Sequence, residues 1–252
     1  DWHPRCITRG IWDETYQIMR RQERFNEMDV SYVLNEELTK ASIRMDVSGI
    51  QIADKSYQWI WKDPEGNIVV QKQGKLSADN AYLEAELKSP MLWWPNDICE
   101  PHLYSSEFIL FDDSMRELER HTAKTGFRRI RLIPNEKSWE NVWVFPATAP
   151  LPPAGLEVNN RRIFAKGSNW VHPEIFVGNI TSERYREQRI LAKKAHFNIL
   201  RIWGGGIVNK ESFYDICDEL GLLVWQEFPL ACNVYPDKPS YLRVLEQEAA
   251  SI

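Results

Sequence analysis

The chain has 252 residues, 43% of them hydrophobic, and a formal net charge of -5 at pH 7. This is enough material for one or two packed cores, and the acidic balance argues against nucleic acid as a partner. No apolar run is long enough to cross a bilayer, so we also expect no membrane partner. No secretory leader is recognisable, and the four cysteines lack metal-ligand spacing. The sequence therefore predicts no metal and no cofactor, and it leaves the localisation open.

Short segments with alternating polar and apolar residues fill the chain between residues 16 and 128. The clearest lie at residues 30–34, 41–47, 57–61 and 107–111. A period of two is typical of half-buried β-strands, and the Asp-Pro-Glu-Gly-Asn run at residues 63–67 predicts a turn between two of them. We therefore predict an antiparallel β-sandwich of about 100 residues, with Trp59 and Trp61 packed in its core.

A different pattern follows residues 146–155, a segment with four prolines that we interpret as a connector. Short apolar strands at residues 163–170, 199–202 and 222–225 alternate with segments of helical periodicity. We expect the first helix to be capped by Thr181 or Ser182, the second to begin near Asn209 and end at Gly221, and a third to span residues 241–249. The inward candidates on the first two helices are Tyr185, Leu191, Ala192, Ala195, Phe213, Ile216, Cys217 and Leu220. Successive strand–helix units predict parallel strands with right-handed crossovers, as at the start of a barrel or a doubly wound domain.

The strands of this second region end in polar and aromatic side chains that could bind a ligand. Arg201 interrupts the apolar run at residues 199–202, and Trp203 follows it just before three glycines. One interpretation is a core strand with a partly buried ion pair and a tight turn. The other is a ligand site, because α/β folds bind ligands at the carboxyl ends of their strands. Asn169 and Trp170 close the preceding strand in a similar way, and indole faces beside hydrogen-bonding groups suit a sugar ring.

A series of motifs runs in order along nearly the whole chain. In its carboxyl-terminal half they lie at residues 164–170, 201–206, 213–221 and 224–228. In its amino-terminal half they are Asp1-Trp2 with residues 4–5 and 10–12, the Leu-Trp-Trp-Pro-Asn run at residues 92–96 with Leu103-Tyr104, and the Gly-Phe-Arg run at residues 126–128. Together the motifs resemble glycoside hydrolase family 2, and residues 203–206 with residues 231–236 resemble its β-mannosidase branch. His3 departs from the family pattern, which usually has glycine there.

The resemblance implies a multidomain fold with β and α/β parts. Residues 1–15 would be the end of an amino-terminal sugar-binding β domain, residues 16–128 an immunoglobulin-like β-sandwich, and residues 129–252 the first three βα units of a (β/α)8 TIM barrel. An incomplete barrel would expose a strand edge and an apolar face. We therefore expect this chain either to self-associate through that edge or to be less stable in its barrel part than in its sandwich.

The implied activity is that of a retaining exo-glycosidase that removes a terminal β-linked sugar, with a β-mannoside as the favoured substrate. Such an enzyme uses two carboxyl groups roughly 5 Å apart, one as acid and base and one as nucleophile. In the family the acid/base glutamate follows an asparagine at the end of the fourth barrel strand. The Asn-Glu pairs of this chain, at residues 26–27, 35–36 and 135–136, all precede the first barrel strand, so we interpret them as turn or surface residues. The resemblance thus places neither catalytic carboxyl group in this chain, which we expect to be inactive alone.

The resemblance also implies which residues border the sugar. Trp203 would form part of the pocket wall, and Arg201 would lie beneath it and orient the nucleophile. The other implied neighbours of the sugar are Asn169, Trp170, Lys166, Asp1 and Trp2. Glu227 would either contact the substrate region or, in the favoured interpretation, form an ion pair with a neighbouring strand. β-Galactosidase, β-glucuronidase or exo-glucosaminidase activity and a non-catalytic carbohydrate-binding module remain the alternatives.

Overall fold

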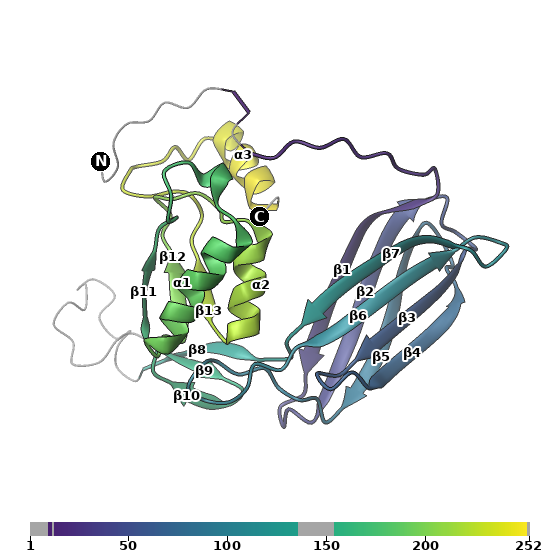
Figure 1. Cartoon of the computed structure of the whole chain (residues 1–252), viewed down its shortest axis with the longest axis horizontal. Helices are drawn as coiled ribbons and strands as arrows, with labels where there is room; N and C mark the ends of the chain where they lie inside the picture. The colour runs from purple at the N-terminus through teal and green to yellow at the C-terminus, as the bar shows by residue number, and fades with distance from the viewer. Residues whose placement is uncertain (1–9, 12, 136–153, 251–252) are drawn as a thin grey trace. The chain divides into compact units, whose positions relative to one another are not determined.

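The computed structural model describes residues 10–11, 13–135 and 154–250, which divide between two compact units (Figure 1). Of the described residues, the first unit comprises 17–94, 99–135 and 154–164, and the second comprises 10–11, 13–16, 95–98 and 165–250. Among the described residues, no helix has both the length and the apolar character that a membrane span requires.

The first unit is built from antiparallel sheets. One sheet has the order β1-β2-β5 and another the order β4-β3-β6-β7 (Figure 1). Their strands are β1 (Arg24–Leu34), β2 (Lys40–Ile50), β3 (Ser56–Lys62), β4 (Ile68–Lys75), β5 (Asn80–Lys88), β6 (Tyr104–Phe111) and β7 (Glu117–Thr125). The four alternating segments of the sequence fall within β1, β2, β3 and β6, so their prediction as strands is confirmed.

The core of this unit collects the alternating apolar side chains of both sheets. Ile43 and Met45 from β2 and Trp59 and Trp61 from β3 are each 1% exposed or less. The two indoles meet edge to face with their centroids 6.1 Å apart, a favourable arrangement for aromatic pairs. Their predicted packing role is therefore confirmed. The predicted turn at residues 63–67 is confirmed too, because the Gly66 amide donates to the Asp63 carbonyl at 2.9 Å.

A small antiparallel sheet of order β10-β9-β8 completes the first unit. Its strands are β8 (Ile130–Pro134), β9 (Ala154–Val158) and β10 (Arg161–Ile163). The prediction of one strand over residues 163–170 is wrong, because β10 ends at Ile163 and the next strand begins at Gly167 in a different sheet. Residues 146–153 of the predicted connector lie outside the described residues, and residues 154 and 155 belong to β9 instead.

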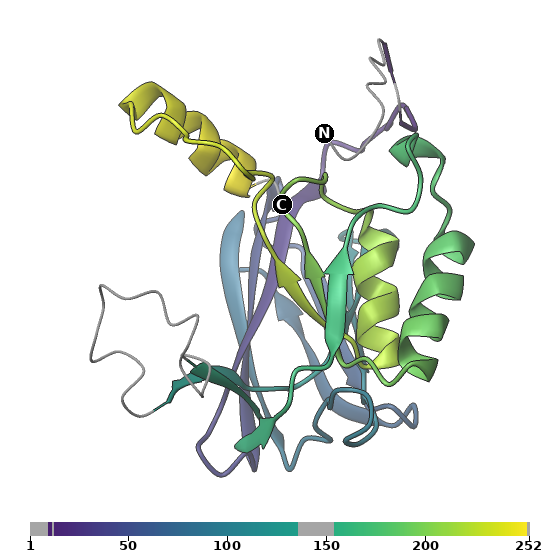
Figure 2. The same cartoon turned by 90° about the vertical axis from the view of Figure 1, so that its left-hand side faces the viewer.

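The second unit holds a parallel sheet of order β11-β12-β13. The strands are β11 (Gly167–Trp170), β12 (Ile199–Ile202) and β13 (Leu223–Gln226), and the helical elements are η1 (Val177–Asn179), α1 (Ser182–Lys194), α2 (Glu211–Leu220) and α3 (Pro239–Ala250). Both α1 and α2 lie on one face of this sheet (Figure 2). The predicted alternation of strand and helix is confirmed in this unit.

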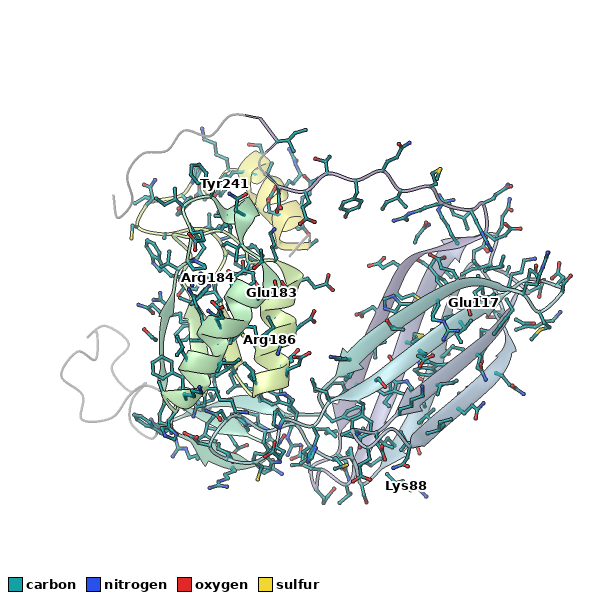
Figure 3. All side chains as sticks on the ribbon, viewed as in Figure 1. Lys88, Glu117, Glu183, Arg184, Arg186 and Tyr241 are labelled. Carbon is teal, nitrogen blue, oxygen red and sulfur yellow. The ribbon has the colours of Figure 1, made fainter. Side chains whose placement is uncertain are left out.

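Local chemistry explains where these helices begin and end. The Thr181 hydroxyl accepts from the Arg184 amide at 3.2 Å and caps α1 as predicted. Gly221 ends α2 in the left-handed conformation, with φ 76°, which glycine adopts without strain. Charged side chains such as Arg184 and Arg186 lie along the exposed face of α1 (Figure 3), and Arg186 donates to Glu219 on α2 at 2.7 Å.

The buried face of α1 differs in part from the prediction. Tyr185 is buried as expected, but Leu191 is 64% exposed and Ala195 is the exposed C-cap residue, so these two assignments are wrong. Arg189 instead occupies the inward position four residues after Tyr185, with no exposed surface. The i, i+4 spacing sets the inner face of the helix, and a charged residue at an inward position escapes a search for apolar periodicity.

A short segment before the α/β region ties the ends of both packed helices together. Asn96 is 8% exposed, and its side-chain amide donates to the Lys193 carbonyl at 3.1 Å and the Phe197 carbonyl at 2.9 Å. Its backbone amide donates to the Gly221 carbonyl at 2.7 Å. Helix ends leave carbonyls without intrahelical partners, so Asn96 supplies donors where α1 and α2 need them.

We predict that Asn96→Ala lowers the free energy of unfolding by about 2 kcal/mol, because it removes the side-chain hydrogen bonds to the Lys193 and Phe197 carbonyls. Gln247→Ala, a change on the exposed side of α3, is the control and should shift stability by less than about 0.5 kcal/mol. Urea unfolding of both variants measures the difference. Equal stability of the two variants would show that the Asn96 hydrogen bonds contribute nothing.

Candidate functional site

The register of the parallel sheet sorts the strand-end residues onto two faces. Asn169 pairs with Arg201, and Arg201 with Trp225, so the three form one row across the strands. Successive side chains of a strand point to opposite faces. Since Leu200 and Ile202 belong to the core shared with α1 and α2, the row of Arg201 faces away from the helices.

Arg201 is the centre of a hydrogen-bonded network on that face. Its Nε donates to Glu227 Oε1 at 2.6 Å, and its Nη2 lies 2.5 Å from the same oxygen. Its Nη1 donates to Asn169 Oδ1 at 3.0 Å. The second carboxylate oxygen of Glu227, Oε2, accepts from the Gly204 amide at 2.9 Å. The predicted ion pair between Glu227 and a neighbouring strand is therefore confirmed, and Arg201 is its partner.

This environment keeps Glu227 ionised. The hydrogen bond from the Gly204 amide, together with the bond and positive charge of Arg201, lowers the pKa of the Glu227 carboxyl below its usual value. The side chains of Arg201 and Glu227 are 34% and 24% exposed, so water still reaches the pair. A carboxylate that is stabilised in its charged form is a poor proton donor, which agrees with the absence of an acid role for Glu227 in our prediction.

The turn after β12 places a tryptophan beside this network. A Cβ atom on Gly205 would lie 2.0 Å from the Trp203 ring, so the indole lies over the bare backbone at this position. A Cβ atom on Gly204 would lie 2.4 Å from the Phe228 carbonyl oxygen. Glycines are thus required where the indole and the loop after β13 approach the turn most closely.

The network and the turn open into a pocket of about 560 Å³. Its lining residues are Arg201, Trp203, Gln226, Glu227, Phe228, Leu230, Ala231 and Cys232. Pockets that bind small molecules combine such apolar surface with a few polar groups in fixed positions. Here a guanidinium and a carboxylate stand beside a half-buried indole, a combination suited to a ligand that presents both hydroxyl groups and C–H surface.

Two of the predicted pocket residues lie apart from this group. Trp170 belongs to the row that faces the helices, where its Nε1 donates to Asn209 Oδ1 at 3.1 Å. Lys166 precedes β11, at the opposite end of the strand from the pocket, and its ammonium pairs with Asp97 at 2.7 Å. The structure therefore brings together Asn169, Arg201, Trp203 and Glu227, but not Trp170 or Lys166. Asp1 and Trp2 lie outside the described residues.

The sequence did not assign Trp225 to the site. Trp225 is 58% exposed on the face of Arg201, whose Cζ lies 5.7 Å from the centroid of the Trp225 ring. In the sequence it ends a continuous apolar run, which predicts a strand but not the exposure of this side chain. Pairing of Trp225 with Arg201 in register would have revealed it, but register is set by tertiary contacts that one sequence does not specify.

Comparison with known proteins identifies the family. Residues 24–128 match the model of the "Glycosyl hydrolases family 2". Over 99% of its length the chain is 31% identical to beta-mannosidase B of Thermothelomyces thermophilus and 30% identical to beta-mannosidase B of Aspergillus niger. The chain belongs to glycoside hydrolase family 2, as its motifs predicted.

Solved structures agree with this assignment. A beta-D-mannosidase from Dictyoglomus thermophilum superposes over 91% of the chain with a TM-score of 0.74 and 27% sequence identity. A beta-glucuronidase from Bacteroides uniformis, 24% identical, shares the fold over 90% of the chain with a TM-score of 0.71. The chain spans 28% of the length of the two curated relatives, 27% of the mannosidase structure and 25% of the glucuronidase structure.

We predict a pH-dependent contribution of Glu227 to stability. Because its pKa is lower in the folded chain than the usual 4.5, its interactions stabilise the fold above the unfolded pKa and are lost as the pH falls through the folded pKa. The difference in unfolding free energy between the wild type and Glu227→Gln should therefore shrink between about pH 5 and pH 3. Glu246→Gln on α3 is the control. A Glu227→Gln difference that stays constant over this range would contradict the prediction.

Proposed function

We propose that the complete protein containing this chain is a retaining exo-glycosidase that removes terminal β-linked mannose, and that this chain supplies part of the sugar pocket. The observation that carries the proposal is the network of Asn169, Arg201 and Glu227 beside the Trp203 indole. The named mannosidases among its relatives favour a mannoside over other sugars. Since the chain spans only part of those relatives, the activity is proposed for the complete protein.

The proposed architecture follows the family. Residues 16–128 would form an immunoglobulin-like sandwich, and residues 129–252 the start of a TIM barrel whose first strands are β11, β12 and β13. Residues 1–15 would end a preceding sugar-binding domain. The antiparallel sheets of the first unit and the parallel strands with packed helices of the second unit support this division.

In the proposed pocket each group has a distinct role. The C–H face of the sugar would stack on Trp203, and the exposed Asn169 amide would bond a hydroxyl group. Arg201, which the Glu227 carboxylate holds in place, would direct its positive charge toward the nucleophile. Asp1 and Trp2 remain proposed contacts from the preceding domain.

The chemical steps would follow the retaining course. One carboxylic acid protonates the departing oxygen while a carboxylate attacks the anomeric carbon, and water then releases the sugar from the covalent intermediate. We assign neither of these two roles to a residue of this chain. Glu227 in particular is ionised and bonded to Arg201 and Gly204, so we assign it a positioning role.

We predict that the complete protein hydrolyses para-nitrophenyl β-D-mannoside with retention of anomeric configuration. The measurement is release of nitrophenol, with the configuration of the first sugar product followed by proton NMR. The corresponding β-galactoside, β-glucuronide and β-N-acetylglucosaminide test the sibling activities. Cleavage of one of these without cleavage of the mannoside would overturn the proposed substrate, and binding of sugars without any cleavage would favour a carbohydrate-binding module.

A pair of glycine variants tests whether the Trp203 indole forms the pocket wall. Gly205→Ala would place a methyl group 2.0 Å from the ring and displace it, whereas Gly206→Ala would meet nothing closer than 3.4 Å. We expect kcat/KM for the mannoside to fall about tenfold or more in Gly205→Ala and to change less than about twofold in Gly206→Ala. Equal activity of the two variants would argue against a role for the indole in binding.

A further inference from the structure

We propose that Trp170 is a positioning residue, which holds the turn that carries Trp203 instead of contacting the sugar itself. The turn is the segment from Trp203 to Asn209, between the end of β12 and the start of α2. This proposal rests on the proposed function for its kinetic readout only. The geometry that supports it involves described residues of the second unit alone.

Trp170 holds the turn at both of its ends. The Trp170 carbonyl accepts a hydrogen bond from the Trp203 amide at 3.1 Å. The Trp170 indole Nε1 donates to Asn209 Oδ1 at 3.1 Å. Asn209 is 6% exposed, so its side chain is fixed in the interior. One residue of β11 therefore spans the whole turn, from the backbone of its first residue to the side chain of its last.

A turn with three consecutive glycines needs such restraints. Glycine loses more conformational freedom on folding than other residues, so Gly204, Gly205 and Gly206 do not fix the position of Trp203 by themselves. Within the turn, the Gly206 amide donates to the Trp203 carbonyl at 3.0 Å. From outside the turn, the Glu227 carboxylate accepts from the Gly204 amide near its start. At its other end, Asn209 is held by the Trp170 indole and by Tyr214 on α2.

Arg189 in turn fixes the plane of that indole. Its guanidinium has no exposed surface, and its Cζ lies 3.4 Å from the Trp170 ring centroid and 4.6 Å from that of Phe213. Among the described residues, no oxygen or nitrogen accepts a hydrogen bond from this guanidinium. Burial lowers the pKa of Arg189 to about 10, and the neighbouring Cys217 thiol opposes this shift.

A buried cation without a charged partner is costly, and a flat guanidinium on an indole face recovers part of that cost through cation–π attraction. The stack restricts the Trp170 ring to one orientation, the one in which Nε1 points at Asn209. Arg189 is thus the third member of a Trp170 clamp, which we define as Trp170, Asn209 and Arg189.

The key experiment measures kcat/KM for para-nitrophenyl β-D-mannoside in the complete protein with Trp170→Phe and Asn209→Ala, singly and together. Each change removes the same indole hydrogen bond, so each should lower kcat/KM about fivefold, and the double variant should be little worse than either single variant. Trp59→Phe is the matched control. It shortens a buried indole of the other unit whose Nε1 has no partner among the described residues, and it should leave kcat/KM unchanged.

The decisive background is Trp203→Ala. If Trp170 acts through Trp203, then Trp170→Phe should have no further effect on kcat/KM once the Trp203 indole is gone. An undiminished fivefold loss in this background would overturn the proposal, because it would mean that Trp170 contacts the sugar directly or acts only on global stability.

Amide hydrogen exchange separates this proposal from the proposed function. In Trp170→Phe and Asn209→Ala the amides of residues 204–209 should exchange about fivefold faster, with β12 and α2 unchanged. If that acceleration is seen in a protein that cleaves no mannoside, the positioning role stands and the proposed function fails. Unchanged exchange in an active mannosidase would overturn the positioning role and leave the function intact.

Discussion

The ion pair between Arg201 and Glu227 is the contact on which the geometry of the candidate site depends. It joins the ends of two adjacent parallel strands, and the same carboxylate accepts from the Gly204 amide at 2.9 Å. Partly exposed pairs of this kind add at most about 1 kcal/mol to stability. The importance of this pair is therefore geometric. It holds a guanidinium, a carboxylate and the start of the Trp203 turn in fixed positions relative to one another.

The alternation of side chains along the short strands separates this ion-paired site from the core. Within β11, neighbouring side chains point to opposite faces of the sheet. Asn169 bonds Arg201 on the open face, while Trp170 packs toward the helices. Strand β12 divides in the same way, with Arg201 on the open face and Ile202 in the core. A four-residue strand can thus supply both a binding group and its support.

The sequence predicted the positions of helices and strands along the chain better than the contacts between them. Periodicity located strands such as β2 and β3, and the Gly221 stop was predictable because a left-handed C-cap favours glycine strongly. The series of motifs along the chain, taken together, was sufficient to predict the family. The inward placement of Arg189, and the face on which Trp170 lies, were not predictable, because both depend on register and on packing between elements distant along the chain.

The most direct test of the sugar pocket is a crystal structure of the complete protein with a bound, non-hydrolysed β-mannoside analogue. The sugar ring should stack on Trp203 with a hydroxyl group in hydrogen-bond reach of Asn169, and the Arg201–Glu227 pair should remain intact. The Trp170 ring should make no contact with the sugar. A ligand that lies against Trp170, or that binds away from the carboxyl ends of β11, β12 and β13, would contradict the proposed site.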